Sequence, residues 1–340
     1  RVKSKVLPGS SDDQKIIEIN IEAKPTGELS AGAGFGTNGG TFAFDIQENN
    51  WLGEGKIVGI NVELSEESLK GKLFYTNPNY DLLGNSIEYH IQNTSNDKPD
   101  QGYENKLITF GAGTSFEQYK DIYTNLALNF SYDDLRTNSN ASASLQKQDG
   151  DFTELAAVYG LTYDKRNRSF MPTDGSVFNF VQSLPIYADK PFVDNTLRFS
   201  TYHEFNENYV GSGKIFLSAI NGLNDEDVRL SKRKSLSTRR LRGFSKGKIG
   251  PVDGNDHIGG NYAAAVNFDV NLPNLLPDSS NTDVSFFVDF GNVWEVDYDD
   301  SLDDSNKLRS STGINASWIS PIGPMTCLLY TSPSPRDLAQ

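Results

Sequence analysis

Apolar and polar residues alternate with a period of two along most of this chain. Residues 126–132 read Leu-Ala-Leu-Asn-Phe-Ser-Tyr, with the even-numbered positions apolar, and residues 262–270 and 284–290 repeat the pattern. Successive side chains of a β-strand point to opposite faces, so each segment predicts a strand with one apolar and one polar face. No helical pattern follows that could cover the apolar faces, so a sheet of this length has to close on itself.

The connections between the predicted strands alternate in length. Short turns and longer polar loops follow one another, the turns at 48–55, 77–85, 116–121, 206–208 and 320–323 and the loops at 92–105, 136–150, 186–195, 221–259 and 295–307. Short turns on one side and long loops on the other are typical of outer-membrane barrels. The predicted fold is therefore all-β, a transmembrane antiparallel up-and-down β-barrel. About fifteen strands fit between Leu29 and Leu329, whereas barrels of this class have an even number, so we expect one or more strands to be missing.

Soluble all-β folds explain the pattern less well. A β-propeller requires an internal repeat, and the chain has none of that kind. Stacked β-sandwiches would be built from strands of about 5–6 residues, whereas the alternating segments here run nearer ten.

Composition narrows the class further. The 340 residues carry a formal charge of −14, which argues against a nucleic-acid partner because phosphate binding depends on lysine and arginine. Mean hydropathy is −0.50, and no apolar run approaches the length of a membrane-spanning helix. A barrel strand has only alternate residues facing lipid, so this low value is compatible with a transmembrane barrel. The single cysteine excludes an internal disulfide framework.

The two ends of the chain differ from the middle. Residues 16–22 form one amphipathic strand, and the segment 1–24 is too short for a domain, so we expect it to be the remnant of a preceding one. Residues 25–326 form the predicted barrel. Residues 327–340 contain two prolines and no terminal aromatic residue, which makes a poor barrel strand. We therefore expect this tail to be unrelated to the barrel.

The first predicted barrel strand is rich in glycine. Gly32, Gly34 and Gly36 are spaced two apart around Phe35, so one face of the strand lacks side chains. A phosphate-binding glycine loop would be followed by a helix, and none is predicted here. Two explanations remain open, namely close approach of another backbone or a lumenal plug, and a seam that pairs weakly.

One segment is strongly basic in this acidic chain. Residues 229–248 contain no acid and nine cations, Arg229, Lys232, Arg233, Lys234, Arg239, Arg240, Arg242, Lys246 and Lys248. The segment is either a loop facing solvent or lipopolysaccharide, or a loop folded into the barrel against acidic residues. The alternation points Asp269 and Asp289 inward, and a confined guanidinium favours bidentate carboxylate partners. Arg242 is the best candidate for an inserted tip, because Gly243 beside it permits a sharp turn.

The tip Leu241-Arg242-Gly243-Phe244 resembles the conserved loop motif of the BamA family of outer-membrane β-barrel assembly factors, within the outer-membrane-protein-85 superfamily. Further matches follow in the family's order along the chain, at 25–27, 50–55, 163–166 with 172–175, 258–261, 287–294 and 320–324. Each match is weak alone, but together they are specific and span nearly the whole barrel. After residue 326 the chain departs from the family, which continues into a last strand ending in an aromatic residue.

The resemblance implies a sixteen-stranded barrel preceded by periplasmic polypeptide-transport-associated (POTRA) domains, of which residues 1–24 would be the last remnant. It implies that Arg242 contacts Asp269 and Asp289. It also implies that the strand containing Gly32, Gly34, Phe35 and Gly36 forms a lateral gate with the last strand. The expected function is assembly and insertion of other barrels in the bacterial outer membrane. The expected partners are unfolded client proteins, lipids with lipopolysaccharide, and accessory lipoproteins.

No residue pattern indicates catalysis, a cofactor or a metal site. His90, His203 and His257 lack ligand spacing, and the acidic segment 297–304 lacks the glycine and closing glutamate of a calcium-binding EF-hand. We therefore expect a non-enzymatic protein. The alternatives are a translocation-assembly or two-partner secretion transporter of the same superfamily, expected to carry fewer POTRA domains, and a diffusion porin, expected to lack an inserted basic loop.

Overall fold

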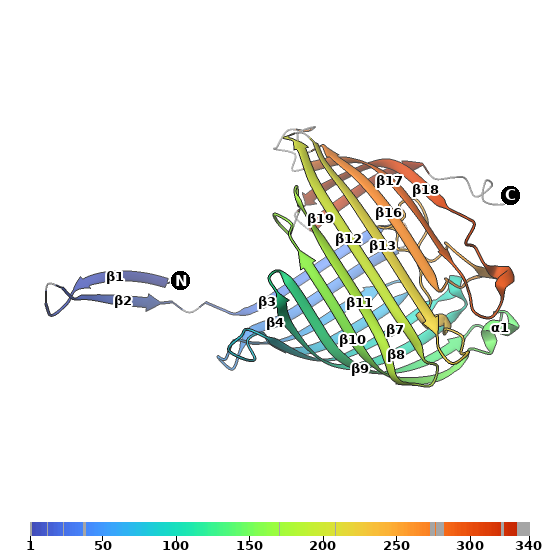
Figure 1. Ribbon diagram of the computed structural model, residues 1–340, viewed down its shortest axis with the longest axis horizontal. Helices are drawn as coiled ribbons and strands as arrows, with labels where there is room; N and C mark the ends of the chain where they lie inside the picture. The colour runs from blue at the N-terminus through green and yellow to red at the C-terminus, as the bar shows by residue number, and fades with distance from the viewer. Residues whose placement is uncertain are drawn as a thin grey trace.

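The computed structural model describes residues 2–331, apart from residues 12, 23, 37–38, 170, 208, 273–275, 277–281 and 321–322. Its main element is a fifteen-stranded antiparallel sheet in which strands that follow one another in the barrel pair with each other, and the first and last strands form the two edges. The sheet curls into an almost closed barrel (Figure 1). The strands are β3 (Gly27–Gly36), β4 (Gly39–Trp51), β5 (Lys56–Ser65), β6 (Ser68–Asn77), β7 (Ser86–Lys98), β8 (Tyr103–Tyr119), β9 (Ile122–Thr137), β10 (Gly150–Asp164), β11 (Gly175–Ala188), β12 (Phe192–Asn206), β13 (Tyr209–Gly222), β16 (Tyr262–Leu272), β17 (Thr282–Trp294), β18 (Arg309–Ser320) and β19 (Gly323–Thr331).

Smaller elements lie at the two ends of the barrel. A hairpin of β1 (Val2–Pro8) and β2 (Lys15–Ile21) extends from one end (Figure 1). The opposite end carries the longer connections, with the short helix α1 (Ala143–Gln146) among them. The remaining elements are η1 (Pro99–Gln101), η2 (Leu230–Lys232), η4 (Asp300–Leu302) and the two-residue strands β14 (Val252–Asp253) and β15 (Asp256–His257). Within the described ranges, no helix has the length and apolarity needed to cross a membrane.

The alternation of the sequence separates the two faces of the sheet. Leu128, Phe268 and Phe290 point outward and are 51%, 53% and 36% exposed. Asp269 and Asp289 occupy the inner face of β16 and β17 and are 6% and 0% exposed. An apolar outer face around a polar interior is the arrangement that a lipid environment requires. The predicted barrel is therefore confirmed, with the expected number of strands.

The barrel has a seam between its two edge strands, β3 and β19. Their Cα atoms come within 8 Å of each other, but no ladder joins them in the described part of the chain. Neighbouring strands alternate in direction, so the first and the fifteenth run the same way. An antiparallel ladder therefore cannot close the barrel directly, and both edges keep backbone groups that another strand can bind.

At both ends of the chain, the structure contains more β-strand than the sequence predicted. The N-terminal segment holds two strands, because Val2–Pro8 pairs with Lys15–Ile21, where one strand was expected. At the other end β19 continues to Thr331, five residues beyond the expected end of the barrel at residue 326. Pairing with β18 supplies its backbone hydrogen bonds, from Ser320↔Gly323 to Thr312↔Thr331. Both prolines of the expected tail lie in residues 332–340, outside the described residues, so for these residues the expected lack of relation to the barrel stays a prediction.

Candidate functional site

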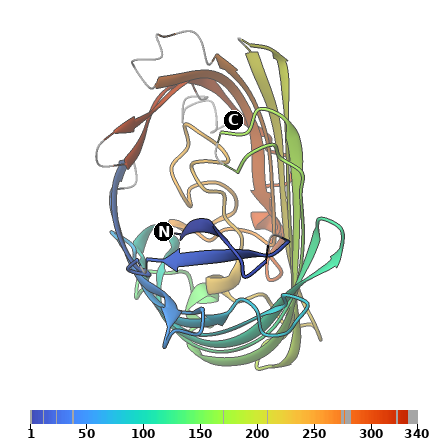
Figure 2. The same ribbon diagram turned by 90° about the vertical axis from the view of Figure 1, so that its left-hand side faces the viewer.

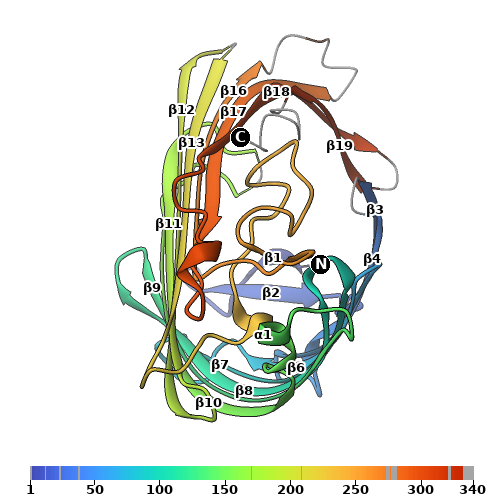
Figure 3. The same ribbon diagram turned by 90° about the vertical axis from the view of Figure 1, so that its right-hand side faces the viewer.

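The basic segment lies inside the barrel. Residues 223–261 connect β13 to β16, turn back from the barrel end and cross the lumen, as Figure 2 and Figure 3 show. Leu236, Leu241 and Ile249 of this loop are buried against the inner wall. The wall is hollowed there by small side chains, because Ala263 and Ala265 occupy inward positions of β16. The loop therefore docks by apolar packing as well as by charge.

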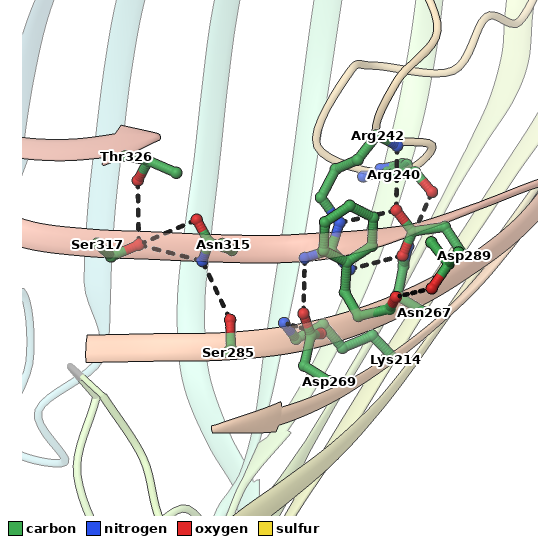
Figure 4. A network of polar contacts seen from close by, with 12 residues as sticks. Lys214, Arg240, Arg242, Asn267, Asp269, Ser285, Asp289, Asn315, Ser317 and Thr326 are labelled. Carbon is green, nitrogen blue, oxygen red and sulfur yellow. Dashed lines mark hydrogen bonds and ion pairs between the residues drawn. The ribbon is translucent and has the colours of Figure 1, made fainter. Parts of the chain in front are cut away.

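The tip of the loop joins two strands of the wall through Arg242. Its Nε donates a hydrogen bond of 2.7 Å to Asp289 Oδ2, and its Nη2 donates one of 2.6 Å to Asp289 Oδ1. Its Nη1 donates a hydrogen bond of 2.6 Å to Asp269 Oδ1. Asp269 lies on β16 and Asp289 on β17, and both side chains point at the tip (Figure 4). The guanidinium thus holds one carboxylate bidentately and a second one singly.

The surroundings of Arg242 favour its charged form. Burial alone would lower the pKa of Arg242, but the hydrogen bonds and charges of Asp289 and Asp269 outweigh burial and raise that pKa. The guanidinium carbon also lies 3.8 Å from the centroid of the Phe287 ring. A buried charge cluster of this kind is stable only while all its members stay paired.

Two further side chains complete this cluster and were not expected from the sequence. Asn267 Nδ2 donates hydrogen bonds of 2.8 Å to the carbonyl of Arg240 and of 2.7 Å to Asp289 Oδ1. Lys214 Nζ donates a hydrogen bond of 3.1 Å to Asp269 Oδ2. The alternation had placed Asn267 on the polar face, but an amide on a polar face does not reveal its partner.

The residues beside Arg242 fit the docked tip. Gly243 has φ +89°, and a Cβ added there would lie 2.8 Å from the Tyr330 ring of β19. Glycine is therefore required both by the backbone conformation and by the close approach of the edge strand. Leu241 is fully buried, and Phe244 is partly buried against the same apolar cluster.

Most other cations of the loop also meet acidic residues of the wall or of neighbouring loops. In the described part of the chain these ion pairs are Arg229 and Lys232 with Glu154, Lys234 with Asp194, Lys246 with Glu67, and Lys248 with Asp100. The partners come from both sides of the barrel, since Glu67 follows β5 and Asp194 lies on β12. The net negative charge of the chain is thus partly neutralised by its own loop.

The first part of the loop joins a cap at the barrel end that carries α1. The cap has its own apolar core, formed by buried Tyr103, Leu135, Ala141, Leu145, Phe152, Leu230, Ile258 and Val296. These residues come from three connections and three strand ends that are far apart in the sequence. No local pattern marks them, so the sequence did not reveal the cap.

Arg229 ties this cap to the inner wall. Its side chain is 2% exposed, Nη2 donates a hydrogen bond of 3.1 Å to Glu154 Oε2, and Nη1 lies 3.9 Å from Asp133 Oδ2. The guanidinium carbon lies 4.9 Å from the centroid of the Phe152 ring. Burial lowers the pKa of Arg229, and the two carboxylates oppose this effect.

Replacing Arg229 with alanine is expected to loosen the cap by about 2 kcal/mol, because Glu154 loses a buried charged donor and Asp133 loses a nearby positive charge. Hydrogen exchange should become faster in α1 and η2 while the strands of the barrel keep their protection. Lys248→Ala, which removes an exposed ion pair with Asp100 from the same loop, serves as the matched control and should change little. Unchanged exchange in the Arg229 variant would show that the cap does not depend on this side chain.

The glycine-rich strand is β3, at the edge of the sheet. Gly32 pairs with Ala43 and Gly34 with Thr41 of β4, and a Cβ added at either glycine would meet no described atom within 4 Å. Close approach of another backbone among the described residues therefore does not explain these two glycines, and the weakly paired seam stays a prediction. Phe35 and Gly36 continue the ladder to β4.

Ligand-type residues are dispersed. His90 lies on β7, His203 on β12 and His257 on β15. In the ranges that the structure describes, no three His, Cys, Asp or Glu side chains gather in a way that could hold a metal ion.

Comparison with known proteins identifies relatives of this chain. Residues 50–329 match the Omp85 superfamily domain. The chain is 27% identical over 324 residues to outer membrane protein assembly factor BamA of Neorickettsia risticii, covering 91% of this chain and 42% of that protein. It is 25% identical over 284 residues to a SAM50-like protein of Schizosaccharomyces pombe, covering 80% and 59%. The chain thus spans about half the length of the curated relatives it matches.

Solved structures share the fold. The barrel superimposes on BamA from Haemophilus ducreyi lacking POTRA domains 1–3 with a TM-score of 0.86 and 24% identity, covering 98% of this chain and 72% of that chain. CdiB from Acinetobacter baumannii is more distant, with a TM-score of 0.59, 12% identity, and coverage of 98% and 62%. Because the family domain matches most of the chain and these barrels share its architecture, this chain belongs to the Omp85 superfamily of outer-membrane β-barrel proteins.

Proposed function

We propose that this barrel assembles and inserts other outer-membrane β-barrel proteins, without an enzymatic step. The observation that carries the proposal is the seam, where β3 and β19 run in the same direction and no described ladder joins them. The names of the relatives, assembly factor BamA and a SAM50-like protein, agree with this activity. A strand of an unfolded client barrel would pair with the free backbone groups of an edge by β-augmentation.

The glycine-rich edge supports the same proposal. A strand with side chains removed from one face packs poorly, so its pairing with a neighbour is easy to exchange. We propose that Gly32, Gly34, Phe35 and Gly36 form the gate strand, and that client binding supplies the free energy of its opening. Lipids with lipopolysaccharide would surround the seam, and accessory lipoproteins would bind at the barrel end that carries β1 and β2. We further propose that β1 and β2 are the end of the last POTRA domain.

The docked loop distinguishes this proposal from a diffusion porin. A diffusion porin needs an open lumen, whereas residues 223–261 cross the lumen here (Figure 3). The Arg242 cluster and the cap would both have to break before a polypeptide could pass. We propose that the loop stays docked during client assembly.

The proposal is tested by reconstituting the protein in lipid vesicles and adding an unfolded client barrel. We expect the client to reach its heat-resistant, folded form several-fold faster than in empty vesicles. The same vesicles should show little ion conductance, since the loop fills the lumen. Client folding no faster than in empty vesicles, together with steady conductance, would favour the porin.

A further inference from the structure

A small cavity lies between the docked loop and the strands β12 and β13. Its volume is about 260 Å³. Three cationic side chains and three hydroxyl side chains contribute to its lining, Arg198, Arg240, Lys246, Thr196, Ser235 and Ser237. We call this cavity the cation pocket. Its lining contains no aspartate or glutamate.

The two arginines of the cation pocket differ from most cations of the lumen in the partners of their charged groups. Most loop cations meet a carboxylate, but neither Arg198 nor Arg240 has one at ion-pair distance within the described part of the chain. Arg198 Nη1 donates a hydrogen bond of 3.2 Å to the amide oxygen of Asn179. Lys246 lies 3.8 Å from Glu67 and is thus only loosely paired. The pocket therefore carries positive charge that the protein itself does not neutralise.

Repulsion between the arginines adds to this imbalance. Burial and the positive charge of Arg198 lower the pKa of Arg240 to about 10, so Arg240 remains cationic at neutral pH. Like charges held together in a partly buried site are unfavourable unless an anion compensates them.

In the described part of the chain, no hydrogen bond to the wall uses the guanidinium donors of Arg240. The carbonyl of this residue accepts a hydrogen bond of 2.8 Å from Asn267. The guanidinium carbon lies 3.2 Å from the centroid of the Phe216 ring, a contact that leaves the N–H donors at the rim of the guanidinium free to bind a ligand. Figure 4 shows Arg240 beside the Arg242 cluster.

We propose that the cation pocket binds a phosphate group. Two guanidinium forks, an ammonium and three hydroxyls offer more donors and more positive charge than a carboxylate with two oxygens can satisfy. A tetrahedral dianion with four oxygens matches them. The phosphate is either a free ion in the lumen or the phosphate of a lipid headgroup. This site is independent of the proposed assembly function and goes beyond it.

Binding is measured by isothermal titration calorimetry with inorganic phosphate, on the protein in detergent at low ionic strength. We expect saturable binding, weakened about tenfold or more by Arg198→Gln and by Arg240→Gln, since each removes a charged donor. Arg239→Gln is the matched control, because Arg239 lies beside Arg240 in the same loop but does not line the pocket. It should bind phosphate like the unchanged protein.

Arg198→Gln keeps the test decisive if Arg240→Gln disturbs the loop, because Arg198 lies on β12 and makes none of the docking contacts of the tip. If a short-chain phosphatidic acid displaces inorganic phosphate from the pocket and does so at a lower concentration than inorganic phosphate needs, the natural ligand is a lipid headgroup. If inorganic phosphate binds and phosphatidic acid does not compete in this way, the natural ligand is the free ion. The proposal would be overturned if phosphate showed no saturable binding. It would also be overturned if both pocket variants and the control bound phosphate equally, which would indicate an adventitious ion only.

Discussion

Replacing Arg242 with alanine is expected to destabilise the folded barrel by about 3 kcal/mol. The change leaves Asp289 and Asp269 buried without the cation that holds both. This loss of stability lies at the lower end of the range for broken buried ion pairs, because Asn267 keeps a hydrogen bond to Asp289 and Lys214 keeps one to Asp269. Urea unfolding in detergent, followed by tryptophan fluorescence and by heat-modified gel mobility, measures the effect.

Arg239→Ala is the matched control for this prediction, because it removes an exposed arginine from the same loop. Its unfolding midpoint should stay close to that of the unchanged protein. A double-mutant cycle with Asp289→Asn tests the contact itself. If Arg242 and Asp289 interact, the double variant is less destabilised than the sum of the two single variants by about 1 kcal/mol or more. Strict additivity would show that the tip is held by its apolar packing alone.

Substituting valine for both Gly32 and Gly34 is expected to have opposite effects on stability and on activity. A Cβ added at either position meets no described atom within 4 Å, and a β-branched residue favours a strand over glycine. Each substitution should stabilise β3 by about 0.5–1 kcal/mol. A firmer edge strand exchanges partners less readily, so client folding in reconstituted vesicles should slow severalfold. Hydrogen exchange of the β3 amides measures the first effect and the rate of client folding the second.

Gly71→Val controls for the substitution itself. Gly71 lies on β6, in the interior of the sheet, and a Cβ there also meets none of the described atoms within 4 Å. It should leave the rate of client folding unchanged. If the β3 variant shows slower exchange but folds clients as fast as the Gly71 variant, the gate function of β3 is wrong.

The alternation of the sequence was enough to predict the barrel, because lipid outside and a polar lumen inside impose opposite demands on successive residues. Leu128 and Asp289 therefore faced the expected sides without any knowledge of the strand pairing. The inward direction of Asp269 followed from the same register. That Arg242 binds both carboxylates was inferred from a motif, and the structure brings the three side chains together.

Other features depend on contacts between distant segments and could not be predicted in this way. The cap joins Leu145, Leu230 and Val296 from three connections that share no periodicity. Asn267 and Lys214 are ordinary polar residues of the inner face until the position of the tip is known. The strand β19 was underestimated because its backbone pairing with β18 outweighs weak local β-propensity.

The shared direction of the two edge strands makes the seam sensitive to orientation. A guest segment that forms antiparallel ladders with β3 and β19 at once must run from the cap end toward the end where β1 and β2 extend. The same peptide turned head to tail can form only parallel ladders there, which are somewhat less stable per residue. The barrel would thus distinguish the polarity of a polypeptide without recognising any of its side chains.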